Sequence, residues 1–380
     1  METIFIILAV LVVAYANGAN DNFKGVATLW GSGTVNYKKA LSWATVSTLA
    51  GSITAFFWGT KLIKTFSGNG LVPDALITNP DFLLAVALGA GLTVLITVLL
   101  GIPISTTHGL TGALAGAGFM AIGTQLGFSK LGNNFFMPLL ISPLVSVFLT
   151  VLIYPLFRFG RQKLGVNKNT CVCLEERVIS VACAGVQNGK CYSVADLRSL
   201  GVVVDTEENC HVRAVEQYAG NIIGLDAQKI LDTLHFISAG AVSFARGLND
   251  TPKIVALSVA AGILGLKVNI LAVALVMALG GLLNARKIAD TMSNRITGMN
   301  HGQGFTANLV TALLVIFASK FGIPVSTTHV SCGSLFGIGL VNGKAHWNVI
   351  GGIVSAWVLT LPIAAVLSAG FYFGLQFLER

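Results

Sequence analysis

The chain consists of a succession of apolar segments, each close to the length that a helix needs to cross a lipid bilayer. A bilayer core requires about 20 predominantly apolar residues per helix. The segments that approach this length are residues 3–30, 40–60, 81–101, 102–125, 137–157, 233–264, 267–285, 304–322, 325–343 and 346–378. Within lipid such segments form helices, because a helix satisfies its own backbone hydrogen bonds. The pattern therefore predicts an all-α polytopic membrane protein with about 10–12 membrane segments.

The composition agrees with this fold class and argues against a soluble enzyme. Of the 380 residues, 54% are hydrophobic and only 11% are charged, and the mean hydropathy is +0.78. A typical soluble domain has about 25% charged residues. The net charge of +8 does not indicate nucleic acid as a partner, because many of the basic residues lie in loops beside the predicted spans.

The succession of apolar segments is interrupted at residues 161–232. This stretch has eight basic and nine acidic residues, which indicates a small soluble insertion with some helix. It also holds five of the six cysteines: Cys171, Cys173, Cys183, Cys191 and Cys210. Their spacing matches no standard zinc site, so we expect reduced thiols rather than a metal centre. The predicted organisation is a first membrane repeat at 1–160, the insertion at 161–232 and a second membrane repeat at 233–380.

Two sequence motifs occur once in each membrane block. Residues Gly18–Lys24 and Gly247–Lys253 share the pattern G-x-N-D-x-x-K. Residues Gly101–His108 and Gly322–His329 follow the pattern G-I-P-[IV]-S-T-T-H and are identical at seven of eight positions. The copies are 229 and 221 residues apart, so the order and spacing of the motifs are nearly preserved. We therefore predict two structural repeats.

The basic loops predict how the chain is oriented. If residues 38–39, 158–168 and 286–295 face the cytoplasm, as basic loops usually do, the first segment runs from outside to inside. The insertion is then cytoplasmic, and both termini lie outside the cell membrane. Each segment of the second block crosses opposite to its mate, which makes the repeats inverted, as in many secondary transporters. Lys61 and Lys64 fall on the outer side and oppose this orientation.

An asparagine–aspartate pair interrupts an apolar stretch in each block. The pairs are Asn20-Asp21 and Asn249-Asp250, and a glycine lies two residues before each asparagine. Such sequences favour a break between half-helices, and broken helices near the midplane expose groups that bind ions and substrates. A buried aspartate costs about 2.5–3.5 kcal/mol, so two in matching positions indicate a function. The structural alternative is an ion pair with the lysine three residues later.

Each serine–threonine–threonine triplet is predicted to open a helix deep in the membrane. The triplets 105–107 and 326–328 follow an isoleucine–proline pair, which ends the preceding helix. Serine and threonine are preferred N-cap residues. A helix N-terminus presents free N–H groups and partial positive charge, so two such starts suit one anion. The alternative is that the hydroxyls only satisfy helix ends or neighbouring helices.

These features together predict a cation-coupled anion importer. Hydroxyl and N–H donors from two helix starts suit a tetrahedral oxyanion, whereas carboxylate and amide oxygens suit a hard cation. Moving an anion into a cell that is negative inside costs about 2.3 kcal/mol per charge for each 100 mV of membrane potential. Co-bound cations are therefore needed to offset this cost. The sequence has no Walker motif, and its spans show no nucleophile–base pair or metal cluster, so we expect no enzymatic activity.

The paired motifs resemble those of the PiT family of inorganic phosphate transporters, and more narrowly its bacterial sodium-dependent members. The resemblance covers both membrane blocks. It implies import of inorganic phosphate by sodium symport, alternating access between inverted repeats, a homodimer and no cofactor besides the coupling ion. By motif it assigns phosphate binding to Ser105, Thr106, Thr107, Ser326, Thr327, Thr328, Asp21 and Asp250. It assigns sodium binding to Asn20, Asp21, Asn249 and Asp250.

Four further residues of the motifs are predicted to surround this site: Lys24, Lys253, His108 and His329. The two histidines are expected to pack beside it rather than to bind ligand. Proton–phosphate symport and transport of sulfate or another oxyanion by the same architecture remain open alternatives. A passive anion channel or a membrane enzyme would belong to a different class, and the family pattern gives no role for residues 161–232.

Overall fold

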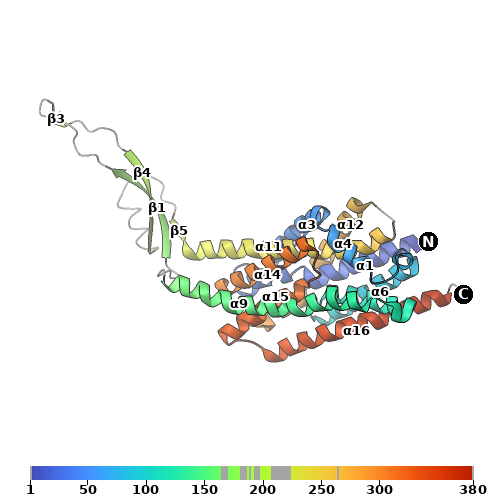
Figure 1. Cartoon of the computed structure of the whole chain (residues 1–380). Helices are drawn as coiled ribbons and strands as arrows, with labels where there is room; N and C mark the ends of the chain where they lie inside the picture. Colours follow the sequence, from blue (N-terminus) through green and yellow to red (C-terminus); the bar gives the residue numbers. More distant parts are fainter. Residues whose placement is uncertain are drawn as a thin grey trace. The chain divides into compact units, whose positions relative to one another are not determined.

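The computed structural model describes residues 2–163, 170–179, 186–187, 190–191, 197–206, 224–262 and 265–378. The chain divides into two compact units. The first unit combines residues 1–155 with 235–380, and the second contains residues 156–234. The boundaries of the second unit lie close to those predicted for the soluble insertion. Figure 1 shows the first unit as a bundle of long helices.

Apart from the ends of two long helices, the described part of the second unit consists of strands. β1 (Thr170–Ile179) pairs antiparallel with both β4 (Leu197–Thr206) and β5 (Gly224–Asp226), in the order β4-β1-β5. β2 (Val186–Gln187) pairs with β3 (Lys190–Cys191). Among the described residues of the predicted insertion, those at its two ends are helical, at 161–163 and 227–232, and the others form strands. The helix expected elsewhere in the insertion falls outside the described part of the chain. The side chains of its five cysteines lie outside the described part of the chain, so the thiol prediction is untested.

The first block of the helical unit contains both long helices and short connecting ones. Its elements are α1 (Glu2–Asp21), η1 (Lys24–Val26), α2 (Ala27–Gly31), α3 (Tyr37–Trp58), α4 (Thr60–Phe66), α5 (Asp74–Ile77), α6 (Pro80–Leu100), α7 (Thr106–Ile122), η2 (Gly123–Gln125), α8 (Phe128–Lys130), η3 (Leu131–Phe136) and α9 (Met137–Lys163). The second block contains α11 (Ala227–Ala260), α12 (Leu266–Asn284), α13 (Arg286–Asp290), η4 (Thr291–Arg295), α14 (His301–Phe321), α15 (Thr327–Asn342) and α16 (Trp347–Leu378).

Among the described residues, seven helical stretches are long and apolar enough to cross a membrane. This confirms the predicted polytopic helical class, with fewer full spans than the sequence suggested. The segments 102–125 and 325–343 were expected to be spans, but α7 and α15 have only 17 and 16 residues. The prolines at 103 and 324 hold the chain extended before each helix begins, which shortens both.

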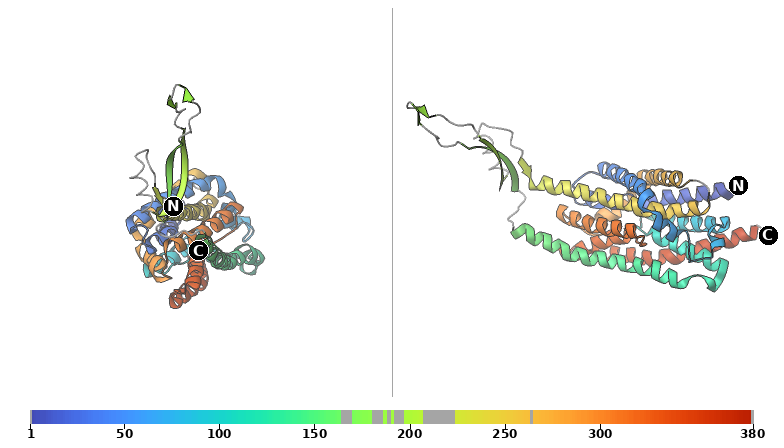
Figure 2. Two further views of the ribbon diagram at one scale, coloured as in Figure 1. Left: turned by 90° about the vertical axis from the view of Figure 1, so that its left-hand side faces the viewer. Right: turned by 45° about the horizontal axis from the view of Figure 1, so that its top comes forward.

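The chain reverses direction in the same way in both blocks. α6 ends at Leu100 and α14 ends at Phe321, and the glycines that cap them, Gly101 and Gly322, adopt left-handed backbone conformations with φ of 73° and 74°. Glycine is the residue that accepts this conformation without strain at the end of a helix. The matched reversals support two structural repeats, whereas their inverted orientation stays a prediction. The start of α1 and the end of α16 lie at the same end of the helical unit (Figures 1 and 2).

α1 lies in the centre of the packing and crosses α12 at very short range. It packs against both α6 and α12. A Cβ atom placed on Gly18 would lie 1.9 Å from the carbonyl oxygen of Met277, and one on Gly280 would lie 2.1 Å from that of Tyr15. Glycine on each helix therefore allows the two backbones to touch, which is typical of helix contacts in membranes. This close crossing fixes the end of α1, where the first asparagine–aspartate pair lies.

Candidate functional site

The first asparagine–aspartate pair ends a helix, as the sequence predicted. Asp21 is the last residue of α1, and the chain turns through Asn22 and Phe23 before it enters η1. This turn brings Lys24 back beside Asp21, with the Lys24 Nζ atom 2.5 Å from the Asp21 Oδ1 atom. Both side chains are buried. The ion pair that was the structural alternative is thus present inside the predicted site.

The second pair does not break its helix, so the predicted interruption at Asn249-Asp250 is wrong. α11 continues from Ala227 to Ala260 and contains Pro252 within it. A continuous helix places Arg246 four residues before Asp250 and Lys253 three residues after it, on one face. Both cations pair with this carboxylate, at 3.7 and 3.4 Å. These buried interactions along one helix face favour the continuous form over the break that the glycine and asparagine suggested.

Both serine–threonine–threonine triplets begin helices inside the protein, as predicted. Ser105 is the N-cap of α7, and its Oγ atom accepts a hydrogen bond from the backbone N–H of His108 at 3.0 Å. Ser326 caps α15 in the same way, accepting from His329 at 3.2 Å. All the hydroxyl-bearing residues of the two triplets are buried. The serines therefore act as capping residues in this conformation.

The threonine hydroxyls connect the helix starts to the aspartates. Thr106 donates to the Oδ2 atom of Asp21 at 2.9 Å, and Thr327 donates to the Oδ2 atom of Asp250 at 3.4 Å. Thr328 of the second block donates to the Oδ1 atom of Asp21 at 3.0 Å. The structure thus brings all four motif copies together in one buried cluster, although they are as far as 307 positions apart in the chain.

The two lysines bridge the blocks in a reciprocal manner. Lys24 of the first block donates to the hydroxyl of Thr328 of the second at 2.7 Å. Lys253 of the second block donates to the hydroxyl of Thr107 of the first at 2.8 Å. The sequence predicts these lysines around the site, and the structure places them inside it.

The two asparagines hold the extended segments that precede the short helices. Asn20 donates to the backbone carbonyl of Ile104 at 2.8 Å, and Asn249 donates to that of Val325 at 3.2 Å. Ile104 and Val325 occupy the same position in their two motifs. The amide nitrogens thereby position the helix starts, and each asparagine also donates to the aspartate that follows it, at 3.1 and 3.0 Å.

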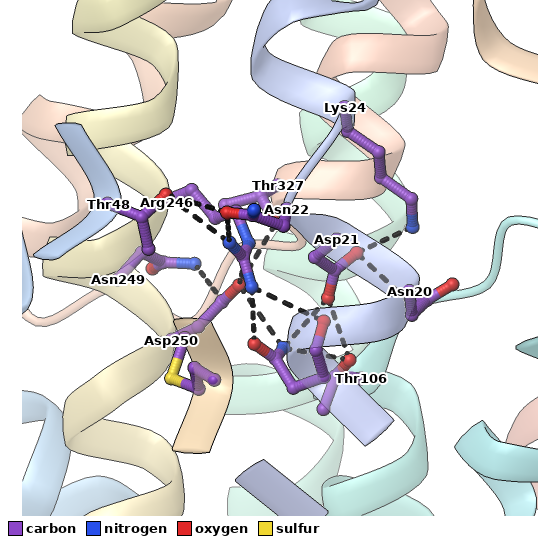
Figure 3. A network of polar contacts seen from close by, with 12 residues as sticks. Asn20, Asp21, Asn22, Lys24, Thr48, Thr106, Arg246, Asn249, Asp250 and Thr327 are labelled. Carbon is purple, nitrogen blue, oxygen red and sulfur yellow. Dashed lines mark hydrogen bonds and ion pairs between the residues drawn. The ribbon is translucent and has the colours of Figure 1, made fainter. Parts of the chain in front are cut away.

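Arg246 is a site residue that the sequence analysis missed. Its guanidinium donates to Asn22 at 3.1 Å and to the side-chain oxygen of Asn17 at 2.7 Å. Asn17 in turn donates to Asp21 at 2.8 Å and to Asp250 at 3.4 Å, so it links the two carboxylates. Figure 3 shows Arg246 at the centre of this network. The signal was present in the sequence, because an arginine within a predicted membrane span is itself an indication of function.

The two histidines lie side by side behind the helix starts. The rings of His108 and His329 meet edge to face, with centroids 4.4 Å apart, and His329 also packs against Trp357. The Nδ1 atom of His108 lies 3.1 Å from the backbone carbonyl oxygen of Trp357. Neither histidine has a hydrogen bond to the aspartates among the contacts of the described residues. Their positions agree with the expectation that they pack beside the site.

The cluster contains more positive than negative charge. Two buried carboxylates, Asp21 and Asp250, face three buried cations, Lys24, Lys253 and Arg246. A buried excess charge is unfavourable unless it is compensated. An anion that enters the cluster can supply the compensation, and the threonine hydroxyls supply further donors. Both aspartates of the cluster already have a protein cation as a partner, so these two predicted sodium ligands are engaged by lysine and arginine in this conformation.

Comparison with known proteins decides the family. The profile of the phosphate transporter family matches residues 17–368, which include all four motif copies. The chain belongs to the phosphate transporter family. It is therefore a multi-span membrane transporter and not an enzyme, as the sequence predicted. The similarity covers almost the whole helical unit together with the insertion.

Relatives and a solved structure agree with membership of the phosphate transporter family. A protein of Pyrococcus abyssi, named as a phosphate permease, is 27% identical over 94% of both chains. A protein of Rhizobium meliloti, named as a low-affinity inorganic phosphate transporter, is 27% identical over 97% of this chain and 95% of its own. The solved structure of a sodium-dependent phosphate transporter matches with a TM-score of 0.74 at 20% identity, over 99% of each chain. This structural match confirms the fold.

Proposed function

We propose that the protein imports inorganic phosphate across the cell membrane by symport with sodium. The observation that carries this proposal is the buried cluster in which both helix starts and both aspartates meet around an excess of positive charge. A secondary transporter needs one such site near the middle of the membrane, formed by both repeats. The alternating-access motion would expose this site to one side of the membrane at a time.

The proposed phosphate ligands are the residues that the motifs indicated. The threonine hydroxyls and the N–H groups at the starts of α7 and α15 would donate to phosphate oxygens. Each of these hydroxyls now donates to a carboxylate or to a backbone carbonyl, so phosphate binding has to exchange these bonds for bonds to the anion. Asp21 and Asp250 would accept hydrogen bonds from the protonated oxygens of phosphate.

Two arguments support sodium as the coupling cation. Carboxylate, amide and carbonyl oxygens are the ligands that hard cations prefer, and both asparagine–aspartate pairs provide them. The solved structure that shares the fold is that of a sodium-dependent phosphate transporter. A homodimer, a cytoplasmic second unit and outward termini are part of the proposal and rest on the family resemblance and on the basic loops.

A proton is the second candidate for the coupling ion. It is favoured by the contact between Lys24 and Asp21, because an ammonium group next to a carboxylate can release or take up a proton when the partners separate. The decisive experiment is phosphate uptake into liposomes that contain the purified protein. Accumulation driven by a sodium gradient at constant pH is expected. Phosphate accumulation driven only by a proton gradient would identify the proton, and not sodium, as the coupling ion. Equilibration of phosphate without accumulation would indicate a passive channel.

A further inference from the structure

The ammonium groups of Lys24 and Lys253 lie in two matching cages of oxygen atoms. The Nζ atom of Lys24 lies 2.5 Å from a carboxylate oxygen of Asp21, 3.0 Å from the carbonyl oxygen of Ile104 and 2.7 Å from the hydroxyl of Thr328. Each cage therefore needs both blocks, because the hydroxyl comes from the helix start of the other repeat. The side chains of both lysines are at most 2% exposed.

The second cage repeats the first position by position. The Nζ atom of Lys253 lies 3.4 Å from a carboxylate oxygen of Asp250, 2.7 Å from the carbonyl oxygen of Val325 and 2.8 Å from the hydroxyl of Thr107. The ring of Phe66 lies on a further side, with its centroid 5.7 Å from Nζ, and an aromatic face also favours a cation.

The chemistry of each cage suits a small inorganic cation as well as an ammonium group. An ammonium group has three N–H donors, and each cage offers three oxygen acceptors, so the lysines fill the cages completely. Carboxylate, carbonyl and hydroxyl oxygens are also the usual ligands of hard metal cations. An ammonium group and a cation such as sodium cannot occupy one cage together, because two positive charges at this distance repel strongly.

We propose that Lys24 and Lys253 are tethered cations that occupy the two coupling-cation positions, and that an inorganic cation enters a cage only when the lysine leaves it. This inference rests on the proposed function, which it refines. The released ammonium group stays attached within the cluster and can turn toward the phosphate. Cation binding and phosphate binding would then favour each other, which is the coupling that symport requires.

Competition with a tethered group makes a quantitative prediction. If a cage is free of its lysine for only about a tenth of the time, the apparent affinity for the inorganic cation is about tenfold weaker than the intrinsic one. Removing the amine while keeping the oxygen atoms should restore the intrinsic affinity. The matched substitution is lysine to methionine, which keeps the length of the side chain and removes its charge.

The test measures binding of radioactive sodium to the purified full-length protein without phosphate. We expect Lys24→Met and Lys253→Met each to bind sodium at least tenfold more tightly than the wild type. Lys38→Met, which removes an exposed lysine at the start of α3, should behave like the wild type. Asp21→Asn combined with Lys24→Met should show no gain, because the cage then lacks its carboxylate. Unchanged or weaker sodium binding in both single variants would overturn the proposal.

A second measurement uses the wild type, because a methionine variant leaves a buried carboxylate unpaired and could fail to fold. Sodium chloride should increase reductive methylation of Lys24 and Lys253 relative to exposed Lys38, whereas choline chloride at equal ionic strength should not. Equal labelling in the two salts would contradict the exchange. If sodium binding depends on the lysines but phosphate uptake is independent of every cation gradient, the proposed function is refuted and the exchange is not. Sodium-driven uptake with lysine-independent sodium binding would refute the exchange alone.

Discussion

Arg246 donates a hydrogen bond to Asn17 at 2.7 Å, and these two residues occupy equivalent positions next to the two copies of one motif. Each lies immediately before the glycine of the G-x-N-D-x-x-K pattern. The repeat therefore places an arginine where its mate has an asparagine, and the two contact each other at the centre of the cluster. The positive excess of the site comes from this one difference, because the aspartates and lysines are duplicated. We expect the asymmetry to matter for binding a single anion.

Replacing the arginine should weaken phosphate binding more than it weakens folding. Arg246→Gln keeps hydrogen-bond donors for Asn17 and Asn22. It removes the third positive charge of the cluster, which the two carboxylates do not neutralise. Unit charges about 4 Å apart attract by about 4 kcal/mol at an effective dielectric constant of 20, so a loss of at least tenfold in phosphate affinity is expected. The control is Arg161→Gln, at an exposed position near the end of α9. Wild-type phosphate affinity in Arg246→Gln, measured by calorimetry, would show that this charge does not face the anion.

The caps and the threonines should have separable effects. Ser105→Ala with Ser326→Ala removes two N-caps, and the loss of each cap lowers the stability by about 0.5–2 kcal/mol. The melting temperature should therefore fall, and the apparent dissociation constant for phosphate should rise a few-fold. Thr106→Val with Thr327→Val removes hydroxyls that now donate to the aspartates. The apparent dissociation constant for phosphate should therefore rise more than in the serine double variant. Both double variants are compared by thermal unfolding in detergent and by phosphate binding. A larger loss of affinity in the serine pair would mean that the serines contact phosphate themselves.

The crossing of α1 and α12 should tolerate no added side chain. Gly18→Ala would place a Cβ atom 1.9 Å from a backbone oxygen of Met277, which cannot move without shifting its helix. Overpacking of this kind typically costs about 1–3 kcal/mol, and here it also displaces the end of α1 that carries Asp21. Gly351→Ala is the control, because no atom lies within 4 Å of its added Cβ. Equal thermal stability of the two variants would contradict the close crossing.

The membrane fold and the starts of the two short helices could be predicted from the sequence because both depend on local chemistry. Long apolar segments, proline before a helix start and glycine at the reversals act within a few residues of the chain. The contact of Lys24 with Thr328 could not be predicted, because it depends on how the two repeats pack together. The continuous helix through Asn249-Asp250 was missed although its ion pairs with Arg246 and Lys253 lie within one helix. The glycine and asparagine of the motif signal a break in both copies alike, whereas only the second copy has an arginine just before the glycine.

The second unit should be dispensable for coupled transport. It forms a separate compact unit at residues 156–234, whereas the motif residues all belong to the helical unit. Replacement of residues 169–226 by a Gly/Ser linker should therefore leave measurable phosphate uptake in liposomes. Surface delivery and melting temperature control for insertion and folding. Complete loss of transport in a correctly inserted, folded variant would assign this unit a direct role.

The aspartates should decide how phosphate is distinguished from sulfate. Both anions are tetrahedral and similar in size, but phosphate at neutral pH keeps at least one P–OH donor and sulfate has none. Asp21 and Asp250 are buried acceptors beside the helix starts, so they can accept that hydrogen bond, whereas sulfate would bring unprotonated oxygen atoms against them. Sites that hydrogen-bond a substrate group reject analogues without it by large factors.

We therefore expect Asp21→Asn and Asp250→Asn each to abolish or severely reduce cation-driven phosphate uptake and to weaken discrimination against sulfate in the binding that survives. An asparagine keeps the size of the side chain, but its amide can donate to a sulfate oxygen, so sulfate should compete better than in the wild type. The measurements are phosphate binding with sulfate as competitor, and uptake with and without a sodium gradient. Asp290→Asn is the control, since this aspartate pairs with Arg295 outside the cluster. Wild-type coupled uptake in both variants would reduce the buried aspartates to structural partners of Lys24 and Lys253.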